Sequence, residues 1–151
     1  MRRGFTLIEL LVVVIILGIL ATVGLTNYRF AQLRGRDAQR KSDLKQIASA
    51  VELYYQDYQV YPNAALLDPG HEFTDGKTTY LKKVPVEPVK GVYFYRRSTN
   101  GNMFQVFAHL ENSQDKNLIV GSVPGYADCG TGWTCNFAVT SSNTTETEVL
   151  P

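Results

Sequence analysis

The amino-acid sequence places a carboxylate inside a long apolar stretch near the N-terminus. Between Phe5 and Leu25 the only polar side chains are those of Thr6, Glu9 and Thr22. An ionised carboxylate in the hydrocarbon of a membrane costs roughly 2.5–3.5 kcal/mol on insertion scales. Glu9 therefore needs a partner for its charge, and a matched cation lowers the cost of burial.

Two cysteines near the C-terminus are a second candidate for chemistry. Cys129 and Cys135 are separated by five residues, two of them glycines, which could close a tight loop. In an exported domain such a pair is by default a disulfide, and in a cytosolic domain it would be two free thiols. Zinc is a weaker alternative, because a site needs four ligands and both His71 and His109 are distant in the sequence.

Catalytic motifs are missing from the rest of the sequence. It contains no nucleophile–base pair, no metal-ligand cluster and no phosphate-cradling G-x-x-x-x-G-K-[ST] motif. We therefore expect neither an enzyme nor a cofactor nor a bound metal, and we interpret His109 as an exposed strand residue. The formal net charge of +1 gives no overall signature of nucleic-acid binding.

The apolar stretch itself is long enough to cross a membrane. Its 21 residues, Phe5 to Leu25, would form a helix of roughly 31 Å, against a hydrocarbon core of about 30 Å. Arg2 and Arg3 precede it, as in a secretory signal peptide. However, the stretch is longer than a usual signal core, contains an acid and ends without a clear cleavage site. A plain membrane anchor fits the length but leaves Glu9 unexplained.

The stretch Gly4 to Glu9, G-F-T-L-I-E, resembles the N-terminal signature of type IV pilins and the related pseudopilins. The match continues through the hydrophobic run to Asn27 and Tyr28. The resemblance implies a leader, residues 1–4, cut between Gly4 and Phe5 by a membrane-embedded prepilin peptidase. It also implies N-methylation of the new N-terminal residue, Phe5.

Cleavage before Phe5 would create an α-amine, which is a cation at neutral pH. Four residues separate this amine from Glu9, so we expect both on one helix face about one turn apart. Glu9 could neutralise its own amine; the resemblance implies pairing with the amine of a neighbouring subunit. Phe5 and Glu9 are therefore the predicted assembly residues.

One position departs from the family pattern. Many members have a proline where this chain has Thr26, and proline would kink or loosen the helix. Gly18 and Gly24 could soften it instead, each costing roughly 1 kcal/mol relative to alanine. We expect a helix that can melt locally between these glycines and Thr26.

The helical pattern continues beyond the membrane segment, residues 5–28, into residues 29–60. Apolar residues recur there at helical spacing, which predicts one helix of about 50 residues that ends before Pro62. We interpret the tyrosines of this face as core packing rather than as a ligand-stacking site. The basic stretch from Arg29 to Lys41 has Asp37 as its one acid, and we expect a solvated or subunit-facing surface rather than a lipid or nucleic-acid site. The apolar face consists of Leu44, Ile47, Ala48, Val51, Tyr54, Tyr55 and Tyr58.

The remaining residues predict a small sheet. Residues 61–90 are rich in turn formers and are predicted as a loop, residues 91–138 as a β-sheet with the cysteine loop, and residues 139–151 as a polar tail. Strand-like runs are 92–95, 104–110 and 118–120, with a hairpin turn signal at Asn100-Gly101. The fold class is α+β: a long N-terminal helix packed on a small antiparallel sheet in a globular head, residues 29–151.

The resemblance implies a structural subunit, and two kinds compete. The cysteine loop favours a major pilin of a type IV pilus-like filament, which is our main expectation. The stretch Tyr80 to Pro88 is similar to major pseudopilins, so a type II secretion or DNA-uptake system is the alternative. A minor tip pilin with an adhesin role is a further alternative.

The resemblance also implies where the chain acts and with what. The precursor is expected in the inner membrane as a single-pass protein, and the product in a surface filament or periplasmic pseudopilus. Its partners would be copies of itself, the prepilin peptidase, membrane lipid before assembly, and an inner-membrane platform with an ATPase. Some major pseudopilins carry a calcium ion near the equivalents of Glu111, Asp115 and Asp128, but the spacing matches no compact calcium loop. Asn143 begins an N-x-T sequon, which is frequent by chance.

Overall fold

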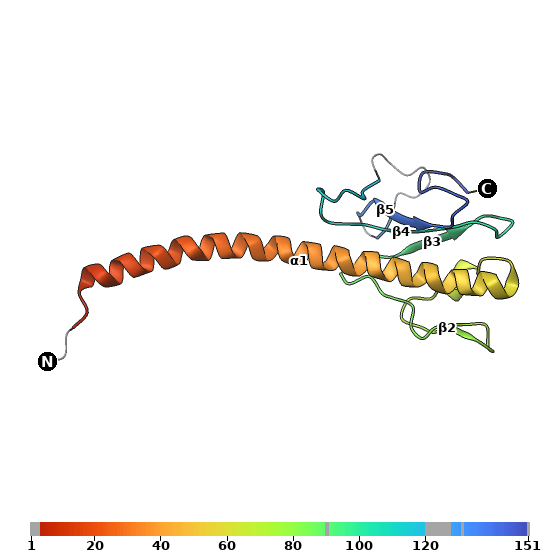
Figure 1. Cartoon of the computed structure of the whole chain (residues 1–151), viewed down its shortest axis with the longest axis horizontal. Helices are drawn as coiled ribbons and strands as arrows, with labels where there is room; N and C mark the ends of the chain where they lie inside the picture. The colour runs from red at the N-terminus through yellow and green to blue at the C-terminus, as the bar shows by residue number, and fades with distance from the viewer. Residues whose placement is uncertain (1–3, 90, 120–127, 131, 151) are drawn as a thin grey trace. The chain divides into compact units, whose positions relative to one another are not determined.

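The computed structural model describes residues 4–89, 91–119, 128–130 and 132–150. The chain divides into two compact units, Met1–Gly35 and Arg36–Pro151. One helix, α1 (Leu7–Tyr58), has 52 residues and takes part in both units (Figure 1). It confirms the single long helix predicted from the sequence and is helical through Gly18 and Gly24. The expected effect of Thr26 concerns a side chain outside the described set.

In the first unit, residues 7–20 of α1 are apolar on all sides apart from Glu9. The large apolar side chains of residues 7–20 are all exposed within the unit, from 45% for Val13 to 82% for Leu7. This stretch is long and apolar enough to cross a membrane by length and composition. A helix with this character must bury its surface in lipid or in other protein.

In the second unit α1 buries one face against the head. Leu44, Ile47 and Val51 are between 0% and 3% exposed, as their spacing predicts, and Ala50 joins them. Tyr58, expected on the same face, is 45% exposed. The helix thus contributes a stripe of small and branched apolar side chains to a core completed by strand and loop residues.

The main sheet has three antiparallel strands, β3 (Phe94–Arg97), β4 (Phe104–Ala108) and β5 (Phe137–Thr140), in the order β3-β4-β5. The central strand, β4, is buried on both faces. Phe104, Val106 and Ala108 belong to the core shared with α1. On the other face Phe107 packs on the cysteine pair, and the Gln105 amide donates to the carbonyls of Thr145 and Glu148. The sheet therefore lies between α1 and a layer made by the C-terminal segments.

Two strand predictions need correction. Leu118 and Ile119 are not in a strand, and Val120 lies outside the described residues; the third strand is β5 instead. The first strand begins at Phe94 rather than Val92, because the Val92 N–H donates to the carbonyl of Cys129 at 2.8 Å and not to β4. Both differences come from contacts that are distant in sequence.

The segment predicted as a loop contains short regular elements. These are a 3-10 turn, η1 (Ala64–Leu66), and a small antiparallel pair, β1 (Phe73–Thr74) with β2 (Thr79–Leu81). The β1–β2 pair lies on a different side of α1 from the main sheet (Figure 1). Phe73 and Tyr80 pack on Tyr54 of α1, with ring centroids 5.7 and 5.3 Å from it. Tyrosine packing, as expected, dominates this end of the core.

The polar tail is held against the sheet rather than projecting from it. Leu150 is 1% exposed, and its carbonyl accepts a hydrogen bond from Arg96 of β3 at 2.8 Å. Ser141 accepts from the Phe104 N–H at 3.1 Å. These contacts give a polar sequence a defined position on the outer face of the sheet.

Candidate functional site

The first candidate site is the start of α1, where Glu9 has a partner within the chain. Its Oε2 accepts hydrogen bonds from the Thr6 N–H at 2.9 Å and from the Thr6 hydroxyl at 2.7 Å. The Thr6 Oγ1 in turn accepts from the Glu9 N–H at 3.3 Å. This reciprocal arrangement is a capping box, which satisfies backbone donors at a helix N-terminus. It explains why the helix begins at Leu7.

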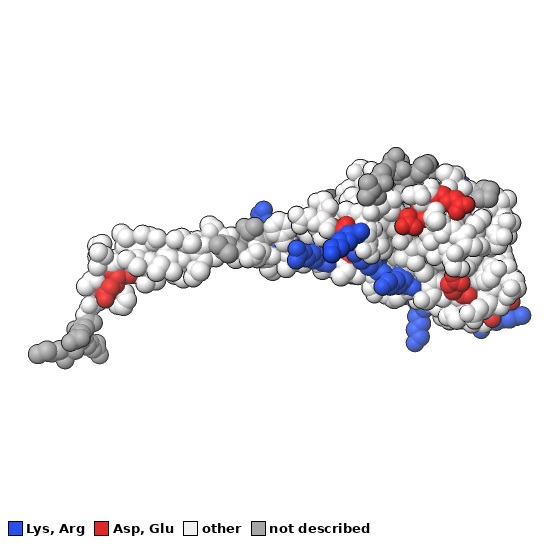
Figure 2. Space-filling view, turned by 45° about the horizontal axis from the view of Figure 1, so that its top comes forward, with Lys and Arg blue, Asp and Glu red and all other residues white. Residues whose placement is uncertain are grey.

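In the uncut chain Phe5 and Thr6 lie outside the helix. The expected position of the Phe5 amine, one helical turn from Glu9, concerns the cut chain and stays a prediction. Phe5 is 77% exposed and lines a shallow apolar groove beside Glu9 with Ile8, Val12 and Val13. Figure 2 shows one acidic patch in this otherwise uncharged stretch, and Glu9 is its only acid by sequence.

The second candidate site is an ion network in the head, centred on Arg40 of α1. The Arg40 side chain is fully buried, at 0% exposed. Its Nε and Nη2 contact Glu87 Oε1 at 2.7 and 2.5 Å. Its Nη1 contacts Asp37 Oδ1 at 2.8 Å and Glu111 Oε1 at 2.7 Å. One guanidinium thus joins three carboxylates from three segments of the chain.

Neighbouring cations on α1 extend the network. Arg36 donates to both oxygens of Glu111, through Nε at 2.8 Å and Nη2 at 2.6 Å, which is a bidentate pair. The Lys41 ammonium contacts Asp115 Oδ2 at 2.6 Å. The basic stretch was expected to be solvated or subunit-facing, and for these residues that is wrong, since they are bonded into the head. Arg29 and Arg34 remain exposed.

Backbone donors complete the coordination of the buried acids. Asp37 accepts from the N–H groups of Glu111 at 2.9 Å and Asn112 at 2.8 Å. Glu87 accepts from those of Val89 at 2.7 Å and Gly91 at 2.8 Å. Hydrogen bonds to the charged form keep a partly buried carboxylate ionised. The network therefore fixes two loops to α1.

The pKa values follow from these contacts. Hydrogen bonds from Arg36 lower the pKa of the Glu111 carboxyl to about 2, although burial opposes them. Burial raises the pKa of Glu87, but the N–H groups of Gly91 and Val89, with Arg40, outweigh burial and leave it lowered. The hydrogen bond from Lys41 lowers the pKa of Asp115. All three carboxylates are thus anions at neutral pH.

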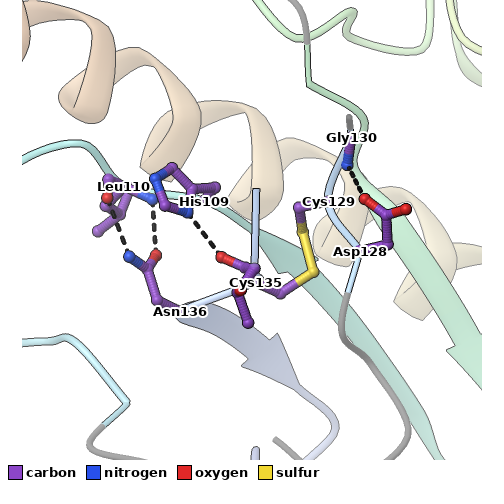
Figure 3. The surroundings of a disulfide bond; sticks show 8 residues. His109, Leu110, Asp128, Cys129, Gly130, Cys135 and Asn136 are labelled. Atoms are coloured by element: carbon purple, nitrogen blue, oxygen red, sulfur yellow. Dashed lines mark hydrogen bonds between the residues drawn. A yellow bond between two sulfur atoms is a disulfide. The ribbon is translucent and has the colours of Figure 1, made fainter. Parts of the chain in front are cut away.

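The cysteine pair closes a loop over this network. Cys129 and Cys135 form a disulfide with an S–S distance of 2.01 Å (Figure 3). Within the loop, Trp133 lies 5.5 Å from the Arg40 guanidinium, in cation–π contact. His109, predicted as an exposed strand residue, follows β4 instead and is half-buried, and its Nδ1 lies 2.6 Å from the Thr134 carbonyl oxygen. The loop is therefore packed against the buried charges, a role that suits structure rather than catalysis.

Only weak signals of this network are visible in the sequence. Asp37 is the single acid in a basic stretch, and Glu87 lies between two prolines, Pro85 and Pro88. Neither pattern predicts which cation pairs with these acids, because Arg40 and Glu87 are 47 residues apart. The Thr6–Glu9 box, by contrast, is visible as a T-x-x-E spacing before an apolar run.

These features define a class of protein. A long N-terminal helix, apolar all round over residues 7–20 apart from Glu9 and packed on a small antiparallel sheet in the second unit, is the architecture of a pilin-like filament subunit. Residues 1–25 match the prokaryotic N-terminal methylation motif. Residues 30–117 match the type II secretion system (T2SS), protein G. The chain belongs to this protein G family, whose members are structural subunits and not enzymes.

Individual relatives agree with the family match. The chain is 34% identical to the type II secretion system core protein G of Pseudomonas aeruginosa over 80% of this chain and 94% of the relative. The core protein G of Vibrio cholerae is 30% identical over 76% of this chain and 84% of the relative. The type IV major pilin protein PilA of Myxococcus xanthus is 38% identical, over 42% of this chain and 29% of the relative. No solved structure matches the chain.

Proposed function

We propose that the chain is the major pseudopilin of a type II secretion system. The precursor is cut between Gly4 and Phe5 by a prepilin peptidase, and Phe5 is N-methylated. The apolar segment, residues 5–28, holds the subunit in the inner membrane with the head in the periplasm. An inner-membrane platform with its ATPase then extracts the subunit and adds it to a periplasmic pseudopilus made of copies of the same chain.

This proposal rests on which residues of the chain are covered by its similarities to known proteins. The protein G match covers residues 30–117, which is mostly head rather than the N-terminal signature that pilins share. The core protein G relatives match most of both chains, whereas the Myxococcus xanthus pilin matches 64 residues. This favours the secretion alternative over our first expectation of a surface pilus.

The proposed assembly step depends on Glu9. Cleavage frees an amine on Phe5, and a neighbouring copy's amine would give Glu9 a full counter-charge in an apolar setting. An unmatched buried charge costs several kcal/mol and a matched one far less, so the pair selects one axial position. In the uncut chain the N–H and the hydroxyl of Thr6 donate hydrogen bonds to the same Glu9 carboxylate. Gly18 and Gly24 would let the helix adjust during packing.

A major pilin of a type IV pilus remains the second candidate. The disulfide loop supports it, since the resemblance to pilins includes such a loop near the C-terminus. A DNA-uptake pseudopilus or a tip adhesin would use the same N-terminal segment. Nothing in the net charge of +1 favours nucleic acid as a partner.

The test removes the gene from its own organism and follows two products. We expect secreted proteins to disappear from the medium while surface pili in the sheared fraction stay at wild-type level. Intact mass and N-terminal sequencing of the native protein should give a chain that begins with methylated Phe5. The matched control restores the gene with its natural sequence, which should restore secretion.

The opposite pattern would contradict the proposal. Loss of surface pili with normal secretion would support the pilin candidate instead. A chain that still begins at Met1 in the native membrane would contradict processing and hence any filament role.

A further inference from the structure

The connection between β4 and β5 is where the family resemblance would place a calcium ion. Between Leu110 and Asn136 this connection contains three carboxylates by sequence, Glu111, Asp115 and Asp128. Calcium takes six to eight oxygen ligands and generally needs carboxylates among them. Whether the connection fits such an ion therefore depends on what these three acids contact.

Two of the acids are already bonded to cations of α1. Both oxygens of Glu111 accept from Arg36, and Oε1 also accepts from Arg40, at 2.6–2.8 Å. Asp115 accepts from the Lys41 ammonium at 2.6 Å through Oδ2 and from the Asn117 N–H at 2.9 Å through Oδ1. A calcium ion would have to displace these donors and then lie beside their positive charges.

The third acid does not assemble a site with them. Asp128 is exposed, and its Oδ1 accepts from the Gly130 N–H at 3.0 Å (Figure 3). Across the described ranges, no three His, Cys, Asp or Glu side chains are grouped so that they could hold a metal. The stretch 120–127 contains no carboxylate by sequence. The residues present therefore do not fit a calcium ion.

Two of these α1 cations are also packed on aromatic rings. Arg40 lies over Trp133 of the disulfide loop, and the Lys41 ammonium lies over the Phe137 ring of β5, both at 5.5 Å. Arg40 thus contacts Glu111 and Trp133, both in the β4–β5 connection, whereas Lys41 contacts Asp115 of the connection and Phe137 of β5. A bound ion would hold these parts together in the same way.

We propose that Arg36, Arg40 and Lys41 of α1, together with the Cys129–Cys135 disulfide, take the place of a bound calcium ion. The head then folds and stays folded independently of calcium. This inference concerns the head alone and holds whether the filament is a pseudopilus or a pilus.

The first test is thermal unfolding of the full mature chain in detergent, in about 1 mM calcium and in excess EGTA. Trp133 is the only tryptophan, so its fluorescence reports on the disulfide loop. A site with a Kd of about 10 μM would raise Tm by roughly 5–10 °C at that calcium concentration. We expect a difference of less than about 1 °C, by the same scale.

The second test compares two lysines one turn apart on α1. Lys41→Met removes the cation that contacts Asp115, whereas Lys45→Met removes an exposed lysine of the same helix. We expect Lys41→Met to lower Tm by a few degrees and Lys45→Met to leave it unchanged. Equal Tm values for the two variants would overturn the proposal. So would a calcium-dependent rise in the Tm of the natural chain, or calcium retained one-to-one in equilibrium dialysis.

Discussion

At the scale of single residues, the stability of the head depends most on Arg40. Arg40→Met keeps much of the side-chain volume and removes the charge that faces Asp37, Glu87 and Glu111. Removing one partner of a buried ion pair costs about 3–5 kcal/mol, because the remaining charges are left uncompensated. We expect the free energy of unfolding, from denaturant titration of the full chain in detergent, to fall by that amount.

The matched control for this prediction is Arg34→Met. Arg34 lies on the same helix and is exposed, so its replacement should change the free energy of unfolding by no more than about 0.5 kcal/mol. Similar losses of free energy of unfolding for both variants would show that the buried network stabilises the head no more than an exposed arginine does.

Glu111 makes the stability of the head sensitive to acid. Its pKa is lowered to about 2, chiefly by hydrogen bonds from Arg36, against an ordinary value of 4.5 in the unfolded chain. A lowered folded-state pKa stabilises the head fully above the unfolded value and loses that contribution as pH falls toward 2. We expect the free energy of unfolding to decline between about pH 5 and pH 2.

Glu111→Gln tests the assignment, because an amide does not titrate. The variant should be less stable at neutral pH and should show a shallower decline over the same pH window. Glu146→Gln, at an exposed acid of the tail, should leave the pH profile unchanged. An unaltered decline in Glu111→Gln would assign the acid sensitivity to other carboxylates.

At the scale of elements, those defined by local sequence patterns could be predicted, and those defined by contacts distant in sequence could not. The helix α1 follows from its own residues, since apolar spacing, Thr6 and Pro62 are all local signals. The strand β5 is four residues long and is defined by pairing with β4, so its sequence alone carries little information. The Arg40–Glu87 pair was likewise invisible, because it joins α1 to a loop 47 residues further on.

The β3–β4 hairpin depends on Gly101, as the Asn100-Gly101 signal predicts. Gly101 has φ +70°, and a Cβ there would lie 2.2 Å from the Val60 Cγ2 atom. Its carbonyl also accepts from the Tyr61 N–H at 2.7 Å. Gly101→Ala should therefore lower the free energy of unfolding by roughly 2–3 kcal/mol, from backbone strain plus overpacking.

Gly76→Ala separates the two contributions. Gly76 also has a positive φ, +86°, but a Cβ there would meet nothing within 4 Å. Its replacement should cost about 1 kcal/mol from the backbone alone. Equal losses at both glycines, in the same denaturant titration, would mean that the Val60 contact relaxes without cost.

At the scale of the whole molecule, each unit meets a different surrounding. In the described part of the head, buried charges are paired within the chain, as Arg40 is with Asp37 and Glu87. The apolar side chains of residues 7–20 are not covered in this way, since all of the large ones are exposed within the first unit. This surface must be covered by lipid or by other protein, and under the proposed assembly Glu9 would meet a neighbouring amine only in the second of these surroundings.

Glu9→Gln should therefore separate processing from polymerisation. The variant keeps the size of the side chain and the G-F-T-L-I stretch, so we expect cleavage before Phe5 and normal membrane insertion. It loses the charge that would pair with a neighbouring amine, and a buried pair broken on one side costs about 3–5 kcal/mol per subunit contact. Cross-linking of native membranes should then give monomers where the natural chain gives a ladder of oligomers.

Thr6→Ser, which keeps the hydroxyl that bonds Glu9, is the control and should retain the ladder. A full ladder from Glu9→Gln would mean that the apolar surface alone sets the packing, and that the carboxylate serves only the capping box at the start of α1.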